Sequence, residues 1–522
     1  MMTTWCCVAV FLLLHFSHYG QGCPDQCQCY SVTKVICSSD KMSSLPDSLS
    51  SEVRELIVVA SGMTHIYSFT LRNNERLTKL VLLNTSLQVV SPGAFFSLTE
   101  LQELEISGSK YLKDLDVETF SKLGNLRKLL LNHNGVKSLK EGLFDTLHNL
   151  ETLQLRGNGL TALPPLLFHN LCNLQALDLS DNSIVTPGGS FFQNLKELRS
   201  LRLGFNQIHS LQPDMFQNTS HLREIDLQGN RISLLPQEIF AHLNELEDLN
   251  LRSNHILGLS PEMFPSSLKV LNLKQNKLFQ LSSGSFRSLP RLNVLNLSQN
   301  KLSVLPEDLF RNLTSLYHLD LSENHIINIA STAFSGLSKI KFINLESNNL
   351  SFIEVDTFRD QKDIERLYLS KNHLKNLPYG FFDVIDFQCI LRLHGNPWSC
   401  DCGLVYLHEW LEYSSKTVED LSKVYCDGPS ALKGQSLITV DLDQLVCLNS
   451  SNSHQQTQTS CPQPVGKGEP SAKNTTLCSI EEVSGAFSIN CRLVKCSNVK
   501  IEANFDQADI RIRISPSCGN KP

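Results

Sequence analysis

One spacing constrains this chain more than any other feature. The pattern Leu-x-x-Leu-x-Leu-x-x-Asn returns along it, with successive asparagines 24 residues apart except for the 22 from Asn254 to Asn276. Three earlier copies carry Ser61, Thr85 and Ser109 in the asparagine position. The asparagines themselves are Asn134, Asn158, Asn182, Asn206, Asn230, Asn254, Asn276, Asn300, Asn324, Asn348, Asn372 and Asn396. Fifteen consecutive units of one period, twelve with asparagine and three without, indicate a repeat architecture.

The residues within one unit predict how it folds. Leu177 and Leu179 alternate with Asp178 and Ser180, so a short strand sends its leucines inward and its polar residues to an open face. Asn182 follows, and its amide can satisfy backbone groups of neighbouring turns. We therefore expect an α/β-type leucine-rich-repeat solenoid shaped as a horseshoe. Its concave face is a parallel β-sheet, and its convex face is mostly irregular or short-helical.

A second column keeps the same phase as the asparagines. Half of the 26 phenylalanines belong to it: Phe95, Phe120, Phe144, Phe168, Phe192, Phe216, Phe240, Phe264, Phe286, Phe310, Phe334, Phe358 and Phe382. Burying one such side chain contributes about 1.5–3 kcal/mol, but only if the next coil covers it. No repeat is therefore expected to fold alone.

Charge and the N-terminal segment bear on the compartment. The net charge of -6 leaves no basic footprint for nucleic acid. Residues 1–22 combine the apolar run 6–14 with the small residues Gly20 and Gly22, as a secretory signal peptide does, although no Lys or Arg precedes the run. The alternative, a membrane anchor, would need about 20 apolar residues. We expect a secreted, extracellular protein with no membrane span.

Cysteines cluster on both sides of the repeats, which we place at 53–396. The predicted N-terminal cap, 23–52, contains Cys23, Cys27, Cys29 and Cys37, and the predicted C-terminal cap, 397–447, contains Cys400, Cys402, Cys426 and Cys447. The terminal coils of a stack expose an apolar face, which a short cystine-tied module can cover. A metal site is the competing interpretation, but secretion and the position at both ends favour disulfide caps. We expect no metal and no cofactor.

Beyond the second cap the composition changes. Residues 448–476 are rich in Ser, Asn, Gln and Thr and are predicted to be a flexible linker. Residues 477–522 are predicted to form a small cystine-rich β module with Cys478, Cys491, Cys496 and Cys518, in which Ile510, Ile512 and Ile514 alternate as in a strand. Cys172 and Cys389 fall within the repeats and Cys461 in the linker; Cys172 is expected to be buried and inert.

Seven sequons are candidates for N-glycosylation: Asn84, Asn218, Asn296, Asn312, Asn349, Asn449 and Asn474. Asn296 lies between Leu295 and Leu297 and should point from its strand into the concave face. A glycan there would block part of that face to a broad protein partner.

No catalytic motif is present: there is no HExxH, GxSxG, glycine-rich phosphate loop or CxxC. Histidines such as His255, His325 and His373 occupy polar repeat positions, where a solvated surface role is expected. The period predicts a broad surface without a pocket, so we expect a binding protein and not an enzyme.

Outward strand positions supply the protein-binding candidates. Near the N-terminal end they form an apolar group: Ile57, Val59, Val81, Leu83 and Leu130. The middle is acidic, with Glu103, Glu105, Asp178, Glu224, Asp226, Asp248 and Asp320. Toward the C-terminal end Phe342, Arg366, Tyr368 and Arg392 form an aromatic and basic patch, the composition favoured at interface hot spots, and rank first. The apolar group ranks second, because it can also pack beneath the first cap.

Several segments are more specific than the repeat. They are LLNTSLQVVSPGAF at 82–95, the long step from Ser109 to Asn134, and LHGNPWSCDCGLVYLHEWLEY at 393–413 followed by YCDGPSALKGQSL. The tail adds the spacing of Cys478, Cys491 and Cys496 and the sequence SCG at 517–519. Together these resemble the non-catalytic regulatory subunits of carboxypeptidase N and, more broadly, secreted leucine-rich-repeat proteins with cysteine-rich caps.

The resemblance carries its own expectations. It implies first-to-third and second-to-fourth disulfide pairing in each cap. It implies a plasma glycoprotein that stabilises a separate zinc carboxypeptidase subunit, in a heterotetramer of two regulatory and two catalytic chains. The alternative is a secreted or matrix leucine-rich-repeat protein that binds its ligand, as a decoy does, without an enzyme partner.

Overall fold

The computed structural model describes residues 23–447, apart from Phe69, Val384, Asp386 and Phe387, and four strands between 477 and 516. The chain divides into two compact units, 1–449 and 450–522. The predicted signal peptide and linker, with Cys461, Cys496, Cys518, Asn449 and Asn474, lie outside the described residues.

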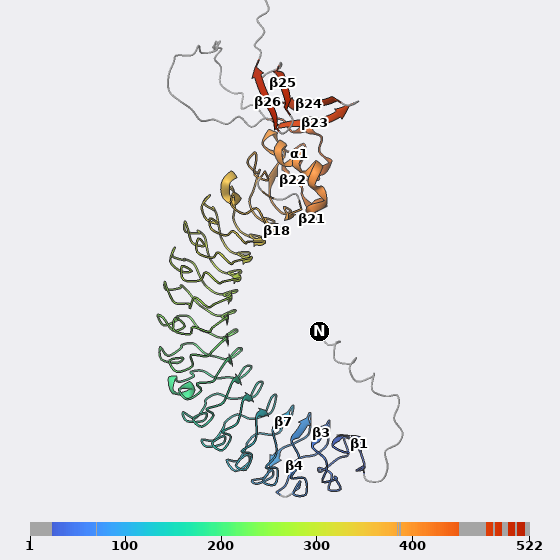
Figure 1. Ribbon diagram of the computed structural model, residues 1–522, viewed down its shortest axis with the longest axis vertical. Helices are drawn as coiled ribbons and strands as arrows, with labels where there is room; N and C mark the ends of the chain where they lie inside the picture. The colour runs from blue at the N-terminus through green and yellow to red at the C-terminus, as the bar shows by residue number, and fades with distance from the viewer. Residues whose placement is uncertain are drawn as a thin grey trace, which may run out of the picture. The chain divides into compact units, whose positions relative to one another are not determined.

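The first unit is a curved solenoid whose inner edge is an 18-stranded sheet (Figure 1). From β2 onward neighbouring strands pair in parallel, in chain order, with one strand per coil. The strands are β1 Cys27–Ser31, β2 Lys34–Ser38, β3 Glu55–Val59, β5 Lys79–Leu83, β7 Glu103–Ser107, β8 Lys128–Leu130, β9 Thr152–Gln154, β10 Ala176–Asp178, β11 Ser200–Arg202, β12 Glu224–Asp226, β13 Asp248–Asn250, β14 Val270–Asn272, β15 Val294–Asn296, β16 His318–Asp320, β17 Phe342–Asn344, β18 Arg366–Tyr368, β19 Ile390–Arg392 and β21 Val418–Glu419. This is the predicted leucine-rich-repeat horseshoe.

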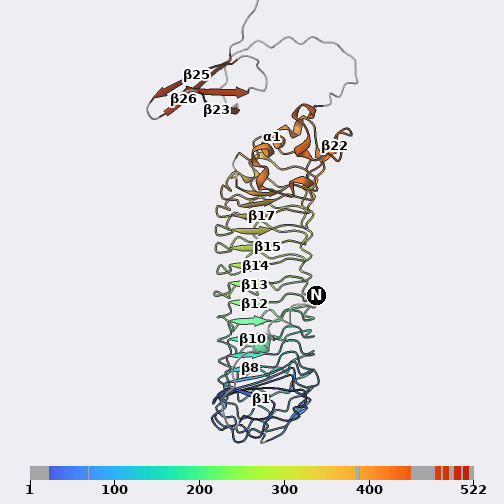
Figure 2. The same cartoon turned by 90° about the vertical axis from the view of Figure 1, so that its right-hand side faces the viewer.

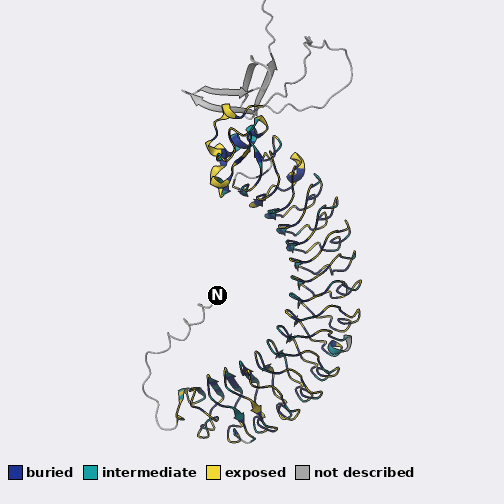
Figure 3. Cartoon of the chain, turned by 180° about the vertical axis from the view of Figure 1, so that it is seen from behind, coloured by how far each residue is buried: buried dark blue, intermediate teal, exposed yellow. Residues whose placement is uncertain are grey.

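Alternation within each short strand sets the faces. In β10, Leu177 is buried, whereas Ala176 and Asp178 are half-buried on the concave face. Leu177 lies between Leu153 and Leu201 of the adjacent strands, so every coil adds its leucine to one row. Figure 2 shows these strands stacked as rungs, and Figure 3 shows buried residues along the inner edge with exposed ones on the loops. The repeat of 24 residues therefore becomes a spatial repeat.

The asparagines bond the coils together. The Asn254 Nδ2 donates to Leu251 O of its own coil at 3.1 Å and to Leu227 O of the coil before at 2.9 Å. Its Oδ1 accepts the Ile232 N–H at 3.1 Å. Where asparagine is missing, the Thr85 and Ser109 hydroxyls pair with each other at 2.8 Å. The predicted role of this column is confirmed.

The phenylalanine column is buried throughout, with at most 3% of any ring exposed. Consecutive rings stack, as in Phe286–Phe310 and Phe310–Phe334, whose centroids are each 6.2 Å apart. The convex side otherwise consists of turns, with the small sheet β4 His65–Ile66 and β6 Val89–Val90 and the 3-10 helices η1 Gly189–Phe192 and η2 Val355–Phe358.

Both ends of the first unit are closed by disulfides. Cys23–Cys29 and Cys27–Cys37 tie the N-terminal cap, and Cys400–Cys426 and Cys402–Cys447 tie the C-terminal cap, the pairing that the resemblance implies. The second cap contains β20 Trp398–Ser399, β22 Cys426–Gly428, α1 Val405–Ser414, η3 Cys402–Leu404, η4 Ser415–Thr417, η5 Leu421–Lys423, η6 Leu437–Thr439 and η7 Leu442–Gln444. Among the residues that the structure describes, no helix is long and apolar enough to cross a bilayer.

The second unit contains two antiparallel hairpins. β23 Leu477–Val483 pairs with β24 Ala486–Arg492, and β25 Val499–Asp506 pairs with β26 Asp509–Pro516. The register places Cys478 opposite Cys491. The strand predicted through Ile510, Ile512 and Ile514 is β26.

Candidate binding surface

The parallel register brings the C-terminal candidates together on the concave face. Phe342 of β17 lies opposite Arg366 of β18, and Tyr368 of β18 lies opposite Arg392 of β19. His318 of β16 lies opposite Phe342 and extends the group by one coil. We call these five residues the concave cluster.

Ring contacts hold the concave cluster together. The His318 and Phe342 ring centroids are 4.4 Å apart, and Tyr368 meets Phe342 edge-on at 5.2 Å. The Arg392 guanidinium lies over the Tyr368 ring, 3.9 Å from its centroid. Burial lowers the pKa of His318, while the charge of Asp320 acts in the opposite direction. His318 therefore favours the neutral, stacking form.

Arg392 is also the centre of an ion-pair network. Its Nε lies 2.6 Å from a Glu419 carboxylate oxygen, and its Nη1 lies 3.6 Å from Glu346. Lys371 contacts the other oxygen of Glu346 at 2.7 Å. Burial acts to raise the pKa of Glu346, but the hydrogen bond and charge of Lys371 outweigh it and lower that pKa. The network joins the last three repeats to β21 of the cap.

These contacts change the roles expected of two candidates. Tyr368 is only 8% exposed because Arg392 and Phe342 cover its ring, so the prediction that it is an open contact residue is wrong. Arg392 keeps its charge occupied by Glu419 and Glu346. Sequence reasoning missed Glu346 and Lys371, which follow their strands at repeat positions of mixed composition. The position of Glu346, for example, is serine in two neighbouring coils, at Ser322 and Ser370.

Two side chains of this region remain available to a partner. Arg366 is exposed, and within the described part of the chain it has no ion pair. Tyr317, the residue before β16, is 44% exposed. A cationic guanidinium and an amphipathic ring beside a packed aromatic base are suited to binding a protein surface.

The N-terminal apolar group is less open than expected. Ile57, Val59, Leu83 and Leu130 are half-buried. Val81 is only 5% exposed, which corrects its prediction as an exposed side chain. The register places Val81 between Ile57 and Glu105, and these neighbours cover it.

Two members of the acidic group are paired with cations. Lys79 contacts Glu103 at 2.8 Å. Arg202 contacts Glu224 at 2.9 Å. Burial raises the pKa of Asp226 against hydrogen bonds from Gln228, and it raises the pKa of Asp248 together with the charges of Glu224 and Asp226. In their ionised form these two carboxylates therefore lower the stability of the folded state.

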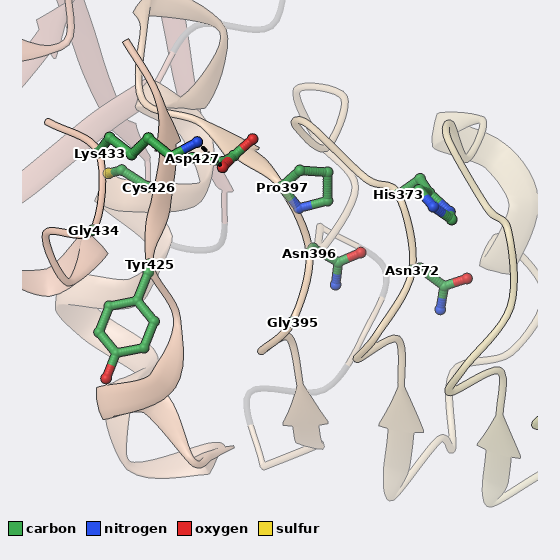
Figure 4. Close-up of a pocket in the computed structure, with 10 residues that line it drawn as sticks. All are labelled: Asn372, His373, Gly395, Asn396, Pro397, Tyr425, Cys426, Asp427, Lys433 and Gly434. Atoms are coloured by element: carbon green, nitrogen blue, oxygen red, sulfur yellow. Dashed lines mark ion pairs between the residues drawn. The ribbon is translucent and has the colours of Figure 1, made fainter. Parts of the chain in front are cut away.

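A groove of about 710 Å³ lies where the last repeats meet the second cap (Figure 4). The Asn372 and Asn396 amides in its wall donate to backbone carbonyls, and Lys433 pairs with Asp427 at 2.9 Å. These four polar side chains are thus engaged within the chain. The described residues contain no cluster of three or more His, Cys, Asp or Glu that could hold a metal ion.

Other predicted sites are distributed over the solenoid. Asn84, Asn218, Asn312 and Asn349 are exposed. Asn296 is half-buried on β15, where its Oδ1 accepts the Ser298 hydroxyl at 2.7 Å. His255, His325 and His373 are exposed, as expected of surface residues. Cys172 is exposed, so the expectation that it is buried is wrong; it follows buried Leu171 on the convex turns and points away from the core.

Comparison with known proteins identifies the repeats. The leucine rich repeat family matches in overlapping segments that run from 51–111 to 314–374, together more than half of the chain. Human carboxypeptidase N subunit 2 is 34% identical over 135 residues, which are 24% of this chain and 24% of that protein. The mouse protein of the same name is 40% identical over 70 residues, 13% of each chain. The aligned parts thus span 24% of the human relative and 13% of the mouse relative.

Solved structures agree on the fold. The Toll chain of a Drosophila Toll–Spatzle complex has a TM-score of 0.67 at 22% identity, covering 77% of this chain and 56% of that one. A leucine-rich-repeat protein of Leptospira interrogans has a TM-score of 0.63 at 26% identity, covering 72% and 93%. These structures resemble this chain in its leucine-rich-repeat fold.

Proposed function

Because this chain belongs to the leucine-rich-repeat family, we propose that it is a non-catalytic, secreted scaffold whose concave surface holds a separate protein. The single observation that carries the proposal is the concave cluster. Aromatic and basic side chains from four consecutive strands gather on the open face, outside the leucine, phenylalanine and asparagine columns that build the core.

The proposed partner is a zinc carboxypeptidase catalytic subunit of the carboxypeptidase N type, stabilised in a heterotetramer. Support comes from the human and mouse relatives whose name makes them a subunit of carboxypeptidase N. The cap motifs and the tail spacing noted in the sequence support the same assignment.

The exposure of each side chain suggests separate roles for the residues of the concave cluster and for the adjoining Tyr317. Phe342, Tyr368 and Arg392 form a preorganised base, because their rings and charges are already engaged with one another. Arg366 and Tyr317 stand free beside this base and contact the partner. Binding to such a rigid surface loses little conformational entropy.

The test is co-expression of the full chain with a carboxypeptidase N-type catalytic subunit, followed by co-purification and by the thermal half-life of the enzyme. The double variant Arg366→Ala, Tyr317→Ala should fold normally and bind at least about tenfold more weakly, the loss expected from two hot-spot truncations. The matched control Arg291→Ala, Tyr111→Ala removes an exposed arginine and tyrosine elsewhere and should bind as wild type does.

Two results would count against the proposal. Equal affinity of the double variant and the control would move the contact away from the concave cluster. Migration of the wild-type chain alone, with no carboxypeptidase activity, would favour the second candidate, a ligand-binding protein that acts without an enzyme. That candidate is supported by similarity to human Reticulon-4 receptor-like 2, 32% identical over 131 residues, which are 25% of this chain and 31% of that protein.

A further inference from the structure

Two rows of side chains run along one flank of the solenoid, outside the concave face. In five consecutive coils the residue directly after the repeat asparagine is basic: Arg231, His255, Lys277, Lys301 and His325. In the same coils the third or fourth residue after the asparagine is large and apolar: Leu234, Leu257, Phe279, Val304 and Ile327. We call these two rows together the flank strip.

The backbone fixes the basic row at one position per coil and the apolar row within two adjacent positions. Each basic residue donates its N–H to a carbonyl of the coil before it, as in Lys277 N to Ile256 O at 3.0 Å and Lys301 N to Leu278 O at 2.8 Å. Farther along the same segment, Leu257 N bonds to Ser233 O at 3.3 Å and Ile327 N to Ser303 O at 3.2 Å. The basic row is therefore as regular as the sheet, whereas the apolar row alternates between two adjacent positions, since Val304 pairs with Asn328 and not with Ile327.

Both rows face solvent. The second residue after each asparagine is buried, as Ile256, Leu278 and Leu302 show, so the first and third residues point away from the core on the same side. The two fourth residues, Leu234 and Val304, are the most exposed of the row. The five apolar side chains are between 42% and 70% exposed. Each is paired with an uncharged neighbour: Ser233, Gly258, Gln280, Ser303 and Asn328. Isolated exposed apolar residues need no explanation, but an unbroken row does.

The cations of the strip are uncommitted. Several basic side chains elsewhere on this solenoid pair with acids of adjacent coils, as Arg202 does with Glu224, Arg223 with Glu245 and Lys269 with Glu247. In the part of the chain that the structure describes, Arg231, Lys277 and Lys301 have no ion pair. The chain thus keeps positive charge beside apolar surface without neutralising it.

We propose that the flank strip docks a second protein through a segment that carries carboxylates beside a row of apolar side chains. Charge complementarity selects the carboxylates, and the apolar row selects against a sulfated polysaccharide, which would leave it uncovered. A lipid surface fits less well, because the row lacks the Trp and Tyr that membrane interfaces favour and its side chains are partly sunk.

The sequon at Asn349 marks one end of the strip. It occupies the position of the basic residue in the next coil, where its N–H bonds to Ile326 O at 2.9 Å. A glycan on this exposed asparagine would limit the docked segment to the five coils before it. The flank strip and the concave cluster lie on different faces, so each can be tested without the other.

The probe is a synthetic peptide with leucines along one face and glutamates beside them, presented to the full secreted chain in a biosensor. Two variants separate the rows: Arg231→Glu, Lys277→Glu, Lys301→Glu, and Leu234→Ser, Phe279→Ser, Ile327→Ser. Each should lower affinity by about tenfold or more, because each removes three contacts at the centre of the interface. The control Arg287→Glu, Arg291→Glu, Lys339→Glu makes the same charge change at exposed sites off the strip and should bind as wild type does.

Four outcomes would overturn the proposal. The first is equal binding by wild type and both strip variants. The second is unchanged binding of a peptide in which serine replaces leucine, which would show that the peptide binds by charge attraction alone. The third is stronger, strip-dependent binding to phosphatidylserine vesicles, which would assign a lipid surface. The fourth is self-association in sedimentation that the apolar variant abolishes, which would make the occupant a second copy of this chain.

Discussion

At the scale of single residues, the asparagine column shows how one side chain can replace secondary structure. Asn254 is 3% exposed and bonds four backbone groups, two of them in the coil before it. No helix or sheet ladder reaches these groups. The amide has two N–H donors and a carbonyl acceptor, whereas the hydroxyl of Thr85 or Ser109 has a single donor.

Replacing Asn254 with Ala should destabilise the solenoid by roughly 2–5 kcal/mol, because buried backbone donors and acceptors would be left without partners. Stability in a repeat array is shared between nearest neighbours. Hydrogen exchange should therefore show lost protection in the coils around Asn254 and little change near either cap. The adjacent exposed variant His255→Ala is the control and should stay within about 0.5 kcal/mol of wild type.

The acidic middle of the concave face predicts a pH effect. Burial and nearby charges raise the pKa of Asp248, so the folded state binds its proton more tightly than the unfolded state does. At neutral pH, where Asp248 is ionised, this lowers stability. As pH falls through the raised pKa, the wild-type chain regains that stability.

Asp248→Asn should consequently be more stable than wild type at about pH 7, with a difference that shrinks toward about pH 4. Thermal unfolding across this range measures it. The comparison variant Asp320→Asn, on the concave face of β16, removes a carboxylate that accepts hydrogen bonds from the Ser322 N–H and hydroxyl and should show no such gain. A difference for Asp248→Asn that grew on acidification would contradict the assigned cause.

At the scale of elements, β18, β19 and β21 are joined by Arg392. Its guanidinium stacks on Tyr368 and pairs with Glu419 and Glu346, so one residue ties the last three coils to the cap. The cap is thus held by polar contacts on the concave side as well as by its disulfides.

Arg392→Ala should loosen the cap and lower stability by roughly 1–3 kcal/mol, because it removes a stacked cation and leaves Glu346 and Glu419 with fewer partners. Limited proteolysis around β21 and hydrogen exchange in β19 measure the effect. Arg366→Ala removes an exposed arginine one strand away and should leave both unchanged. Equal sensitivity of the two variants would show that the pairing of Arg392 does not secure the cap.

Elements also show how far sequence reasoning reached. The repeat period predicts the concave-sheet strands from β3 to β19, and its phase predicts the buried phenylalanine column. Both depend only on contacts between identical positions of adjacent coils. The burial of Val81 and Tyr368 depends on which unlike side chains lie opposite them, and the period carries no information about that. The residues of the flank strip also recur with the period, but they follow the asparagine and lie outside the strand positions from which the binding candidates were predicted.

At the scale of the whole molecule, the solenoid behaves as a stack of interchangeable units. Deleting residues 207–230, one full period, should give a folded chain that is shorter by one coil, because Asn206 then precedes Arg231 as it now precedes Gln207. Deleting only 207–218 removes half a period and breaks the phase of all later columns. Secretion yield and circular dichroism should distinguish the two, and equal behaviour would show that the phase does not govern folding.

The direction of the asparagine bonds has a consequence for how this chain is made. Asn254 reaches back to Leu227 and Ile232, and the same backward reach recurs at Asn276 and Asn300. Each coil leaving the ribosome therefore completes the one already outside, beginning from a disulfide-tied start that emerges first. Such a molecule can be assembled in the order of its synthesis, with the unfinished surface always limited to the newest turn.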